Sequence, residues 1–346
     1  MSFYTLDPLH DSRWDDLVAS HPRASVFHAR GWLKALARTY GYRPFVLTST
    51  PDEGPLSSGI AFCAVTSWLT GARLVSLPFA DHAEPLLGGA DDESETEDWI
   101  RELGSQGRWK YVELRPIAWG RRADSPLVIG PSFWLHTLDL RPPLQELAHN
   151  MHKDCIRRRI QHAQQMSLEY ERGSSDALLQ AFYRLLVITR KRHRLLPQPY
   201  SWFQNLIKEF CPRPEIRVAR KDGVAVAAIF TLRHRGSVVY KYGCSDERLH
   251  RLAGMPFLFW KLIEESKAEG AVQIDLGRTE PENRGLIEFK DRLGASKCPI
   301  SYLRHPRFEE TVNLDSPRVA AVRRVFSTLP SGISSGLGKL VYRHMA

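Results

Sequence analysis

Three ionisable residues that could serve in acid–base chemistry or in charge stabilisation fall close together near residue 280. Residues 272–277, VQIDLG, predict a short strand whose C-terminal end carries Asp275, and Arg278 follows directly. Lys290 lies on the next predicted helix. Because binding sites in α/β sheets gather at strand ends, we expect these three side chains to form a reaction site.

The elements just upstream must position this group. Residues 238–242 are aromatic and β-branched, which favours a strand. Met255 and Pro256 open a long helix, since proline is tolerated in a first turn. Apolar residues at helical spacing give this helix one buried face, and Gly270 ends it.

Two further pairs of residues are candidates for substrate binding. Tyr240 and Tyr242 alternate with a lysine, so one face of the strand should present both phenols. Either that face or the lysine face reaches a site, because the other must pack on the core. Arg190 and Arg194 lie one turn apart on the predicted helix 176–194, a spacing suited to a phosphate. Cations also stabilise a helix C-terminus, so a solvated helix end is the alternative.

The charge of the chain is divided unequally. Residues 1–140 contain 13 lysines and arginines against 18 acids, a net charge of −5, whereas residues 141–346 contain 35 against 21, a net charge of +14. A basic half of this kind attracts phosphates, acidic glycans, RNA or anionic lipid. An arginine-rich surface without a specific partner is the alternative.

The composition is that of an ordinary globular protein. Hydrophobic residues make up 43% and aromatic residues 10%. No segment approaches the ~20 apolar residues of a membrane span, and the N-terminus does not resemble a signal peptide. The five cysteines form no CxxC pair, and no histidine or cysteine spacing indicates a metal site. We therefore expect reduced thiols, no metal and a cytoplasmic location.

The order of predicted elements divides the chain into two α+β domains and a tail. Length alone suggests about two domains. Residues 1–132 read as helices combined with a largely antiparallel sheet. Residues 133–310 contain three strands joined by two-residue turns, followed by the elements around Lys290. Residues 311–346 form a basic, partly amphipathic tail that packs on the second domain or lies on a membrane surface.

Several segments, taken in order, resemble a known family. They are the RxxIxxA pattern that begins at Arg157, followed by ITRKRHRLLPQPY, VARKDGVAVAAIFTLRH, VVYKYGCSDERLHRLAGMPFLFWKLIE, EGAVQIDLGRTE and GLIEFKDRLGA. Upstream, WLKALARTYGYRP and SWLTGARLVSLPFADHAEPLL extend the likeness. Over roughly residues 1–305 the chain resembles the FemAB-like branch of the GNAT acyltransferases, and within it the BioF2-like (CelD-like) acetyltransferases. The resemblance implies tandem GNAT-like domains, with donor and acceptor meeting in the second domain and the groove between the domains.

The resemblance also implies catalytic roles. Relatives that extend peptidoglycan bridges from aminoacyl-tRNA carry a Phe-Lys pair ahead of a Gly-Ala segment, and Phe289 and Lys290 match it. The lysine of that pair steadies the oxyanion of the tetrahedral intermediate, a large term in acyl transfer. We expect direct attack without a covalent enzyme intermediate. Asp275 would assist proton removal from the amine, and Arg278 would bind a phosphate or a carboxylate.

The acyl donor stays open between two candidates. GNAT enzymes bind the CoA pyrophosphate in a Q/R-x-x-G-x-G/A loop at a helix N-terminus. The matching stretch begins at Arg248 and has Arg251 in place of a glycine, with Gly254 just beyond. An acyl-CoA such as acetyl-CoA, held by these three residues, is one candidate. Aminoacyl-tRNA is the other, although the sequence lacks the long helical arm of several peptidoglycan-bridge enzymes.

The overall expectation is an N-acyltransferase that modifies an amine of a cell-envelope or exopolysaccharide precursor. Its substrate would be a small molecule or a lipid-linked or nucleotide-linked glycan, met in the cytoplasm or at the inner membrane by peripheral contact. Two alternatives remain. One is an aminoacyl-tRNA-dependent ligase of the peptidoglycan-bridge type, and the other is a catalytically degenerate GNAT scaffold in polysaccharide assembly.

Overall fold

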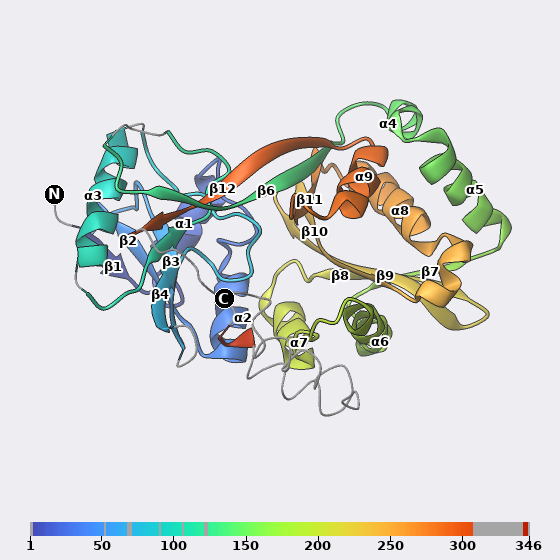
Figure 1. The fold of residues 1–346 in the computed structure, drawn as a ribbon, viewed down its shortest axis with the longest axis horizontal. Coiled ribbons are helices and arrows are strands. Elements are labelled where there is room, and N and C mark those ends of the chain that lie inside the picture. Colours follow the sequence, from blue (N-terminus) through green and yellow to red (C-terminus); the bar gives the residue numbers. More distant parts are fainter. Residues whose placement is uncertain are drawn as a thin grey trace. The chain divides into compact units, whose positions relative to one another are not determined.

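The computed structural model describes residues 3–51, 53–67, 71–89, 91–105, 107–120, 124–306 and 342–344. These residues form two compact units (Figure 1). The first contains the described residues up to Phe133 together with 299–306 and 342–344, and the second runs from Trp134 to Cys298. The first boundary lies beside the predicted one at 132. The second differs from the predicted 310, because the last strand among the described residues returns to the first unit.

The first unit is a mixed sheet flanked by helices. Its strands lie in the spatial order β1-β2-β3-β4-β5-β12, with β4 and β5 parallel and the other neighbouring pairs antiparallel. The strands are β1 (Tyr4–Leu6), β2 (Arg43–Thr48), β3 (Ile60–Ser67), β4 (Gly71–Val75), β5 (Val112–Leu114) and the end of β12 (Ser296–His305). The helices are α1 (Arg13–Ser20), α2 (Arg30–Tyr40) and α3 (Asp91–Ser105).

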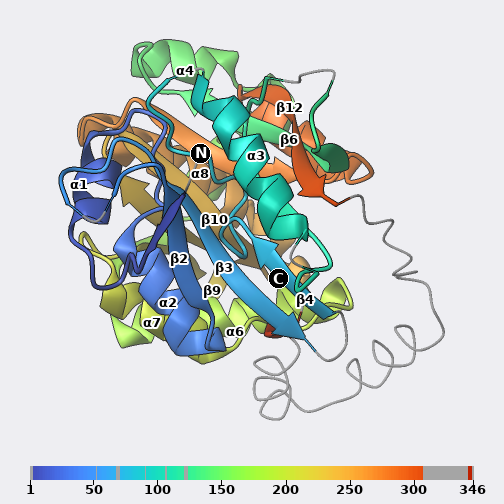
Figure 2. The same cartoon turned by 90° about the vertical axis from the view of Figure 1, so that its left-hand side faces the viewer.

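Alternation along β2 shows how both faces of this sheet are covered. Leu47 belongs to a core cluster that includes Trp99 of α3. The preceding residue, Val46, points to the other face beside Gly59, where an added Cβ would lie only 2.8 Å from Trp14 of α1. Helices α1 and α3 therefore pack on opposite faces, as the period of two along a strand requires. Figure 2 looks onto this unit.

A buried cluster of charged side chains joins β12 to β5. Glu113 accepts hydrogen bonds from Nε of Arg115 at 2.9 Å and from Nε of Arg304 at 2.8 Å, and all three residues are buried. Burial raises the pKa of Glu113, but the two guanidiniums outweigh it and hold the pKa below its usual value. Arg115 also lies over the ring of Tyr302, 4.8 Å from its centroid. Residues about 190 positions apart are thereby fixed in one core.

The second unit is a sheet with strands in the order β6-β11-β10-β9-β8-β7, in which only β10 and β11 are parallel neighbours. Its strands are β6 (Val128–Asp139), β7 (Glu169–Gly173), β8 (Glu215–Lys221), β9 (Val224–His234), β10 (Ser237–Ser245) and β11 (Gln273–Thr279). Its helices are α4 (Leu144–Asn150), a π turn (Lys153–Arg157), α5 (Arg158–Gln165), α6 (Asp176–Arg192), α7 (Tyr200–Glu209), a 3-10 turn (Glu247–Leu252), α8 (Gly254–Ala268) and α9 (Arg284–Arg292).

The helices of the second unit cover both faces of its sheet. Helices α5, α8 and α9 lie on one side, and α6 and α7 lie on the other (Figure 1). On β9, Ile229 belongs to the core cluster under α8, whereas Phe230 packs against Phe203 of α7 with ring centroids 5.7 Å apart. The two hairpin turns around β9 are those predicted, with Asp222, Gly223 and Arg235 at positive φ.

A second buried charge network anchors α8 on this sheet. Arg217 of β8 is fully buried and donates to Glu265 at 2.9 Å, to Glu215 at 2.8 Å and to the Thr231 hydroxyl at 2.9 Å. Arg172 of β7 pairs with the same two glutamates. Because every charge has several partners, burial of the network is compensated within the unit.

The predicted tail, residues 311–346, lies outside the described residues except for 342–344. There the carbonyl of Arg343 accepts a hydrogen bond from the Tyr42 hydroxyl at 3.0 Å, and the carbonyl of His344 accepts one from Arg73 at 3.0 Å. Among the residues described, we find no helix with the length and hydrophobicity that a bilayer crossing requires.

Candidate active site

The site begins where two parallel strands separate. Strands β10 and β11 pair only from Ser237 to Val239, opposite Gln273 to Asp275. Beyond these residues, β10 continues along β9 to Ser245, and β11 continues along β6 to Thr279. The facing edges of both strands therefore carry backbone amides and carbonyls that are not used in a ladder between them. Such edges can bind an extended ligand through its amide groups.

A β-bulge in β10 separates the two tyrosines that were expected to share a face. Tyr240 pairs with Thr231, but Tyr242 pairs with Phe230, so one extra residue lies between them. Tyr240 packs against Phe259 of α8, with centroids 4.8 Å apart. Tyr242 is buried on the α7 side, where its hydroxyl accepts a hydrogen bond from Trp202 at 2.9 Å. The prediction of two phenols on one face is wrong, because a bulge inverts the alternation that follows it.

The Tyr240 phenol lies over Gly243 on the same strand. An ideal Cβ at Gly243 would come within 1.9 Å of the Tyr240 hydroxyl oxygen and 3.1 Å of the Met255 side chain. Glycine is therefore needed here to give the ring its place. Burial raises the pKa of Tyr240 well above its usual value, so the phenol stays protonated and can only donate or accept a neutral hydrogen bond.

Asp275 lies inside β11 and not at its end. The strand extends to Thr279, which pairs with Trp134 of β6, and a bulge falls between Asp275 and Arg278. Asp275 is 5% exposed and its carboxylate accepts a hydrogen bond from the amide of Gly277 at 2.7 Å. The prediction that Asp275 lies at the C-terminal end of this strand is therefore wrong. Gly277, at φ 72°, supplies the left-handed residue of the bulge, and the pairing with β6 resumes beyond it.

Lys290 is the one residue of α9 that is fully buried, at 2% exposure. Its ammonium donates to the Gly277 carbonyl at 2.9 Å, to the Thr279 hydroxyl at 2.7 Å and to the Arg278 carbonyl at 3.4 Å. The lysine charge is thereby held at the bulged segment of β11. Gly277 connects the two predicted catalytic side chains, since its amide binds Asp275 and its carbonyl binds Lys290.

Phe289 and Arg278 complete the part of the predicted site that the structure brings together. The ring of Phe289 packs against Phe259, 5.4 Å between centroids, and Phe259 also contacts Tyr240. Arg278 is half-buried on β11. Phe259 of α8 thus contacts both Tyr240 and Phe289, and Gly277 of β11 contacts both Asp275 and Lys290.

The predicted donor-binding residues lie at the other end of β10, where α8 begins. Gly254 packs so closely on β9 that an added Cβ would lie 2.9 Å from Ala227. Arg248 is exposed and pairs with Asp246 at 2.6 Å. Arg251 is exposed on the 3-10 turn. The N-terminus of a 15-residue helix with an adjoining glycine is suited to an anion, although the arginine pairing means that the loop differs from a simple glycine cradle.

Basic side chains from α6 lie beside this turn. The guanidinium of Arg192 lies 3.4 Å from Nε2 of His250, measured from Nη1, and 3.3 Å from Nε2 of His193, measured from Nη2. Burial and then the Arg192 charge lower the pKa of both histidines. Helix α6 ends at Arg192, and Arg194 has a left-handed φ of 55°. The predicted helical spacing of Arg190 and Arg194 is therefore wrong, because Arg194 lies beyond the helix.

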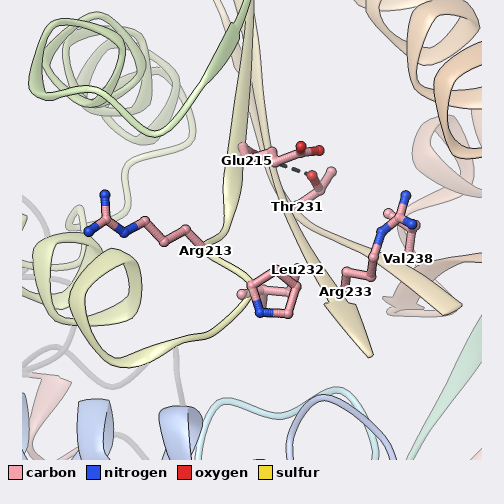
Figure 3. Close-up of a pocket in the computed structure, with 7 residues that line it drawn as sticks. Arg213, Glu215, Thr231, Leu232, Arg233 and Val238 are labelled. Carbon is pink, nitrogen blue, oxygen red and sulfur yellow. Dashed lines mark hydrogen bonds between the residues drawn. The ribbon is translucent and has the colours of Figure 1, made fainter. Parts of the chain in front are cut away.

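A hollow elsewhere in the second unit involves none of the predicted residues. It is open to solvent and lies where β8 and β10 begin and β9 ends (Figure 3). Arg213 and Arg233 extend on either side of it, and Thr231 donates to the Glu215 carbonyl at 3.2 Å. The hollow is next to the buried Arg217 network and not to the separation of β10 and β11, so we assign it no part in the chemistry.

Sequence reasoning missed two polar residues near Lys290. Thr279, fully buried, supplies the shortest of the lysine contacts. His136 of β6 is fully buried and lies 3.3 Å from Asp291 of α9. Both read as ordinary strand residues, and only the pairing of β6 with β11 places them here. Within the described residues, no group of histidines, cysteines and acids is arranged to hold a metal ion.

Comparison with known proteins concerns the fold of the chain. Residues 151–291 match the family described as acetyltransferase (GNAT) domain. No curated protein sequence matches the chain. Among solved structures, FemX aligns with a TM-score of 0.68 at 12% identity, covering 88% of this chain and 97% of that one. L-PGS from Bacillus licheniformis aligns with a TM-score of 0.55 at 12% identity, covering 92% and 97%.

A third solved structure is a tandem GNAT protein from the clavulanic acid biosynthesis pathway, without acetyl-CoA. It aligns with a TM-score of 0.50 at 13% identity, covering 88% of this chain and 97% of that one. Residues 151–291 of the chain thus match a GNAT acetyltransferase domain, which supports the prediction of an acyltransferase. Over both units the fold is similar to that of FemX and of the tandem GNAT protein, and the predicted fold of tandem GNAT-like domains is confirmed.

Proposed function

We propose that the chain transfers an acyl or aminoacyl group from an activated donor to an amine of a cell-envelope or exopolysaccharide precursor. The separation of β10 from β11 next to a buried lysine is the observation that carries this proposal. An amide-bearing donor arm can bind, as an added strand would, the edges that β10 and β11 do not use in a ladder with each other. Its carbonyl would then lie beside the bulge that holds Asp275 and Lys290.

The reaction we propose is direct attack. The amine nitrogen bonds to the donor carbonyl carbon, the carbonyl oxygen becomes an oxyanion, and the thiolate or alkoxide of the donor leaves as the carbonyl re-forms. Lys290 would stabilise the oxyanion by exchanging its longest contact, the 3.4 Å one to the Arg278 carbonyl. Asp275 would accept the proton of the amine, and the protonated Tyr240 would donate to the oxyanion or to the leaving group.

The basic surface at the start of α8 supports a donor that carries phosphates. Arg190 and Arg192 lie on α6 and Arg194 lies just beyond its end, whereas Arg248 and Arg251 lie in the turn before α8. Acyl-CoA and aminoacyl-tRNA both present phosphates that such a surface attracts. The work of the enzyme would take place in the cytoplasm, on a soluble precursor or on one that is linked to a lipid at the inner membrane.

A donor and acceptor screen tests the proposal. Thermal unfolding of the full chain is followed with acetyl-CoA, longer acyl-CoAs, aminoacyl-tRNA and nucleotide-linked amino sugars, since a bound ligand raises the midpoint with ln(1 + [L]/Kd). Any donor that binds is then tested for transfer to the amino sugars by mass spectrometry. Transfer from a donor that binds supports an enzyme. Binding of a glycan with no donor affinity and no transfer would establish the scaffold alternative instead.

A further inference from the structure

The imidazole of His136 is enclosed between β6 and α9. The side chain is fully buried, and within the described residues Nδ1 has no hydrogen-bond partner. Nε2 lies 3.3 Å from a carboxylate oxygen of Asp291, close enough for an ion pair but poorly aligned for a hydrogen bond. A buried ring with so few polar contacts is stable only while it is neutral.

Helix α9 is held by contacts with β11, α8 and β12 and by the His152 amide, which donates to the Arg292 carbonyl at 2.9 Å. It has nine residues, too few to be stable alone, and Lys290 is the residue of this helix that is fully buried. Lys290 binds the bulge of β11, Phe289 packs on α8, and Asp291 lies between His136 and Lys297, whose ammonium is 2.6 Å away. His136 therefore contacts the helix at the residue next to the buried lysine.

Burial and the nearby lysines oppose protonation of the His136 imidazole and together outweigh Asp291, which favours it. Burial and the nearby Lys290 lower the pKa of His136, Asp291 raises it, and Lys297 lowers it further, so that the result is a pKa below the ordinary 6.5. These groups come from α9 and β12. A folded-state pKa below the unfolded value means that docking of α9 is fully stable above pH 6.5 and weakens as the pH falls.

We propose that His136 is a positioning residue whose neutral imidazole seats α9, and with it Lys290, against β11. Protonation at acid pH places a positive charge beside the Lys290 ammonium and loosens the helix. The functional consequence, an acidic limb in the rate of acyl transfer, rests on the proposed function. The seating of α9 itself does not, and it can be measured without any substrate.

The test is hydrogen–deuterium exchange of the full chain between pH 7.5 and 5.5. The peptide covering α9 is compared with the one covering α7, which corrects for the intrinsic effect of pH on exchange. In the wild type we expect α9 to lose about tenfold in protection relative to α7 at pH 5.5. In His136→Gln, which keeps a neutral group towards Asp291 and cannot be protonated, that pH-dependent loss should disappear.

Two results would overturn the inference: no excess exchange of α9 in the wild type, or an equal excess in His136→Gln. If the variant does not fold, the histidine ring signals of the wild type decide the question. A fully buried ring must then titrate below pH 6.5, at the pH where the loss of α9 protection levels off. A failure of the proposed function would look different, since turnover would be absent while the exchange behaviour stayed as described.

Discussion

Replacing Gly243 by alanine is the sharpest structural perturbation of the proposed site. The new Cβ would lie 1.9 Å from the Tyr240 hydroxyl oxygen and 2.8 Å from the carbon that bears it. Both distances are below any real contact, so the ring must move. It cannot move freely, because its other face packs on Phe259. Gly243→Ala should therefore displace Tyr240 and strain the contact with α8.

Gly243→Ala should lower the free energy of unfolding by about 1–3 kcal/mol, as the overpacking of a core does. A double-mutant cycle isolates its cause. In a Tyr240→Ala background the obstacle is gone, and Gly243→Ala should cost nearly nothing, which gives a coupling of about 1–3 kcal/mol between the two sites. The proposed transfer should fall in Gly243→Ala and in Tyr240→Ala alike, since each removes the phenol from its place.

Urea unfolding of the four proteins provides the assay, with the m-value checked for constancy. Gly285→Ala on α9 is the matched control, because nothing lies within 4 Å of its Cβ and alanine favours a helix by about 1 kcal/mol. Equal costs of Gly243→Ala in both backgrounds would refute the packing explanation. A Gly285→Ala protein that is less stable than the wild type would contradict the conclusion that an added Cβ is tolerated where no atom lies within 4 Å.

Further predictions concern the buried charges. Arg217→Met removes a fully buried guanidinium that donates to Glu265, Glu215 and the Thr231 hydroxyl, and it should cost about 1.5–3 kcal/mol in urea unfolding, since Glu265 keeps its pair with Arg172. Arg220→Met on the same strand, whose partner Glu171 is half exposed, should cost at most about 1 kcal/mol. Similar costs for the two would contradict the account. Burial raises the pKa of Glu84 above that of the unfolded chain, so its contribution to stability is lost as the pH rises. Glu84→Gln should accordingly raise the unfolding midpoint at pH 8 and bring little gain at pH 4, and the reverse order would show that the carboxylate is stabilising.

Much of the fold follows from local patterns in the sequence. The helix from Gly254 to Ala268 has its proline in the first turn and its glycine after the end. The two-residue turns around β9 carry the residues that tolerate positive φ. Each of these features depends on residues that are adjacent in the chain, so a single sequence is enough to predict it. The resemblance to tandem GNAT proteins added the arrangement of the two units.

The parts that sequence reasoning missed depend on partners far along the chain. A bulge between Tyr240 and Tyr242 leaves the composition of the strand unchanged, so simple alternation placed both phenols on one face. Gly277 looks like a strand terminator, yet pairing with β6 carries β11 to Thr279. Lysines are rarely buried, and the Gly277 and Arg278 carbonyls together with the Thr279 hydroxyl make the burial of Lys290 favourable.

The most direct test of acyl transfer at the bulge of β11 is the turnover of Lys290→Met with a donor and amine that the wild type couples. The account predicts that kcat falls by about 10²–10³-fold, the effect of removing one donor to an oxyanion. Circular dichroism should show an intact fold. Lys261→Met, which removes a half-buried lysine paired with Glu264 on α8, should keep the wild-type rate. A Lys290→Met enzyme that turns over within about threefold of the wild type would contradict the central claim.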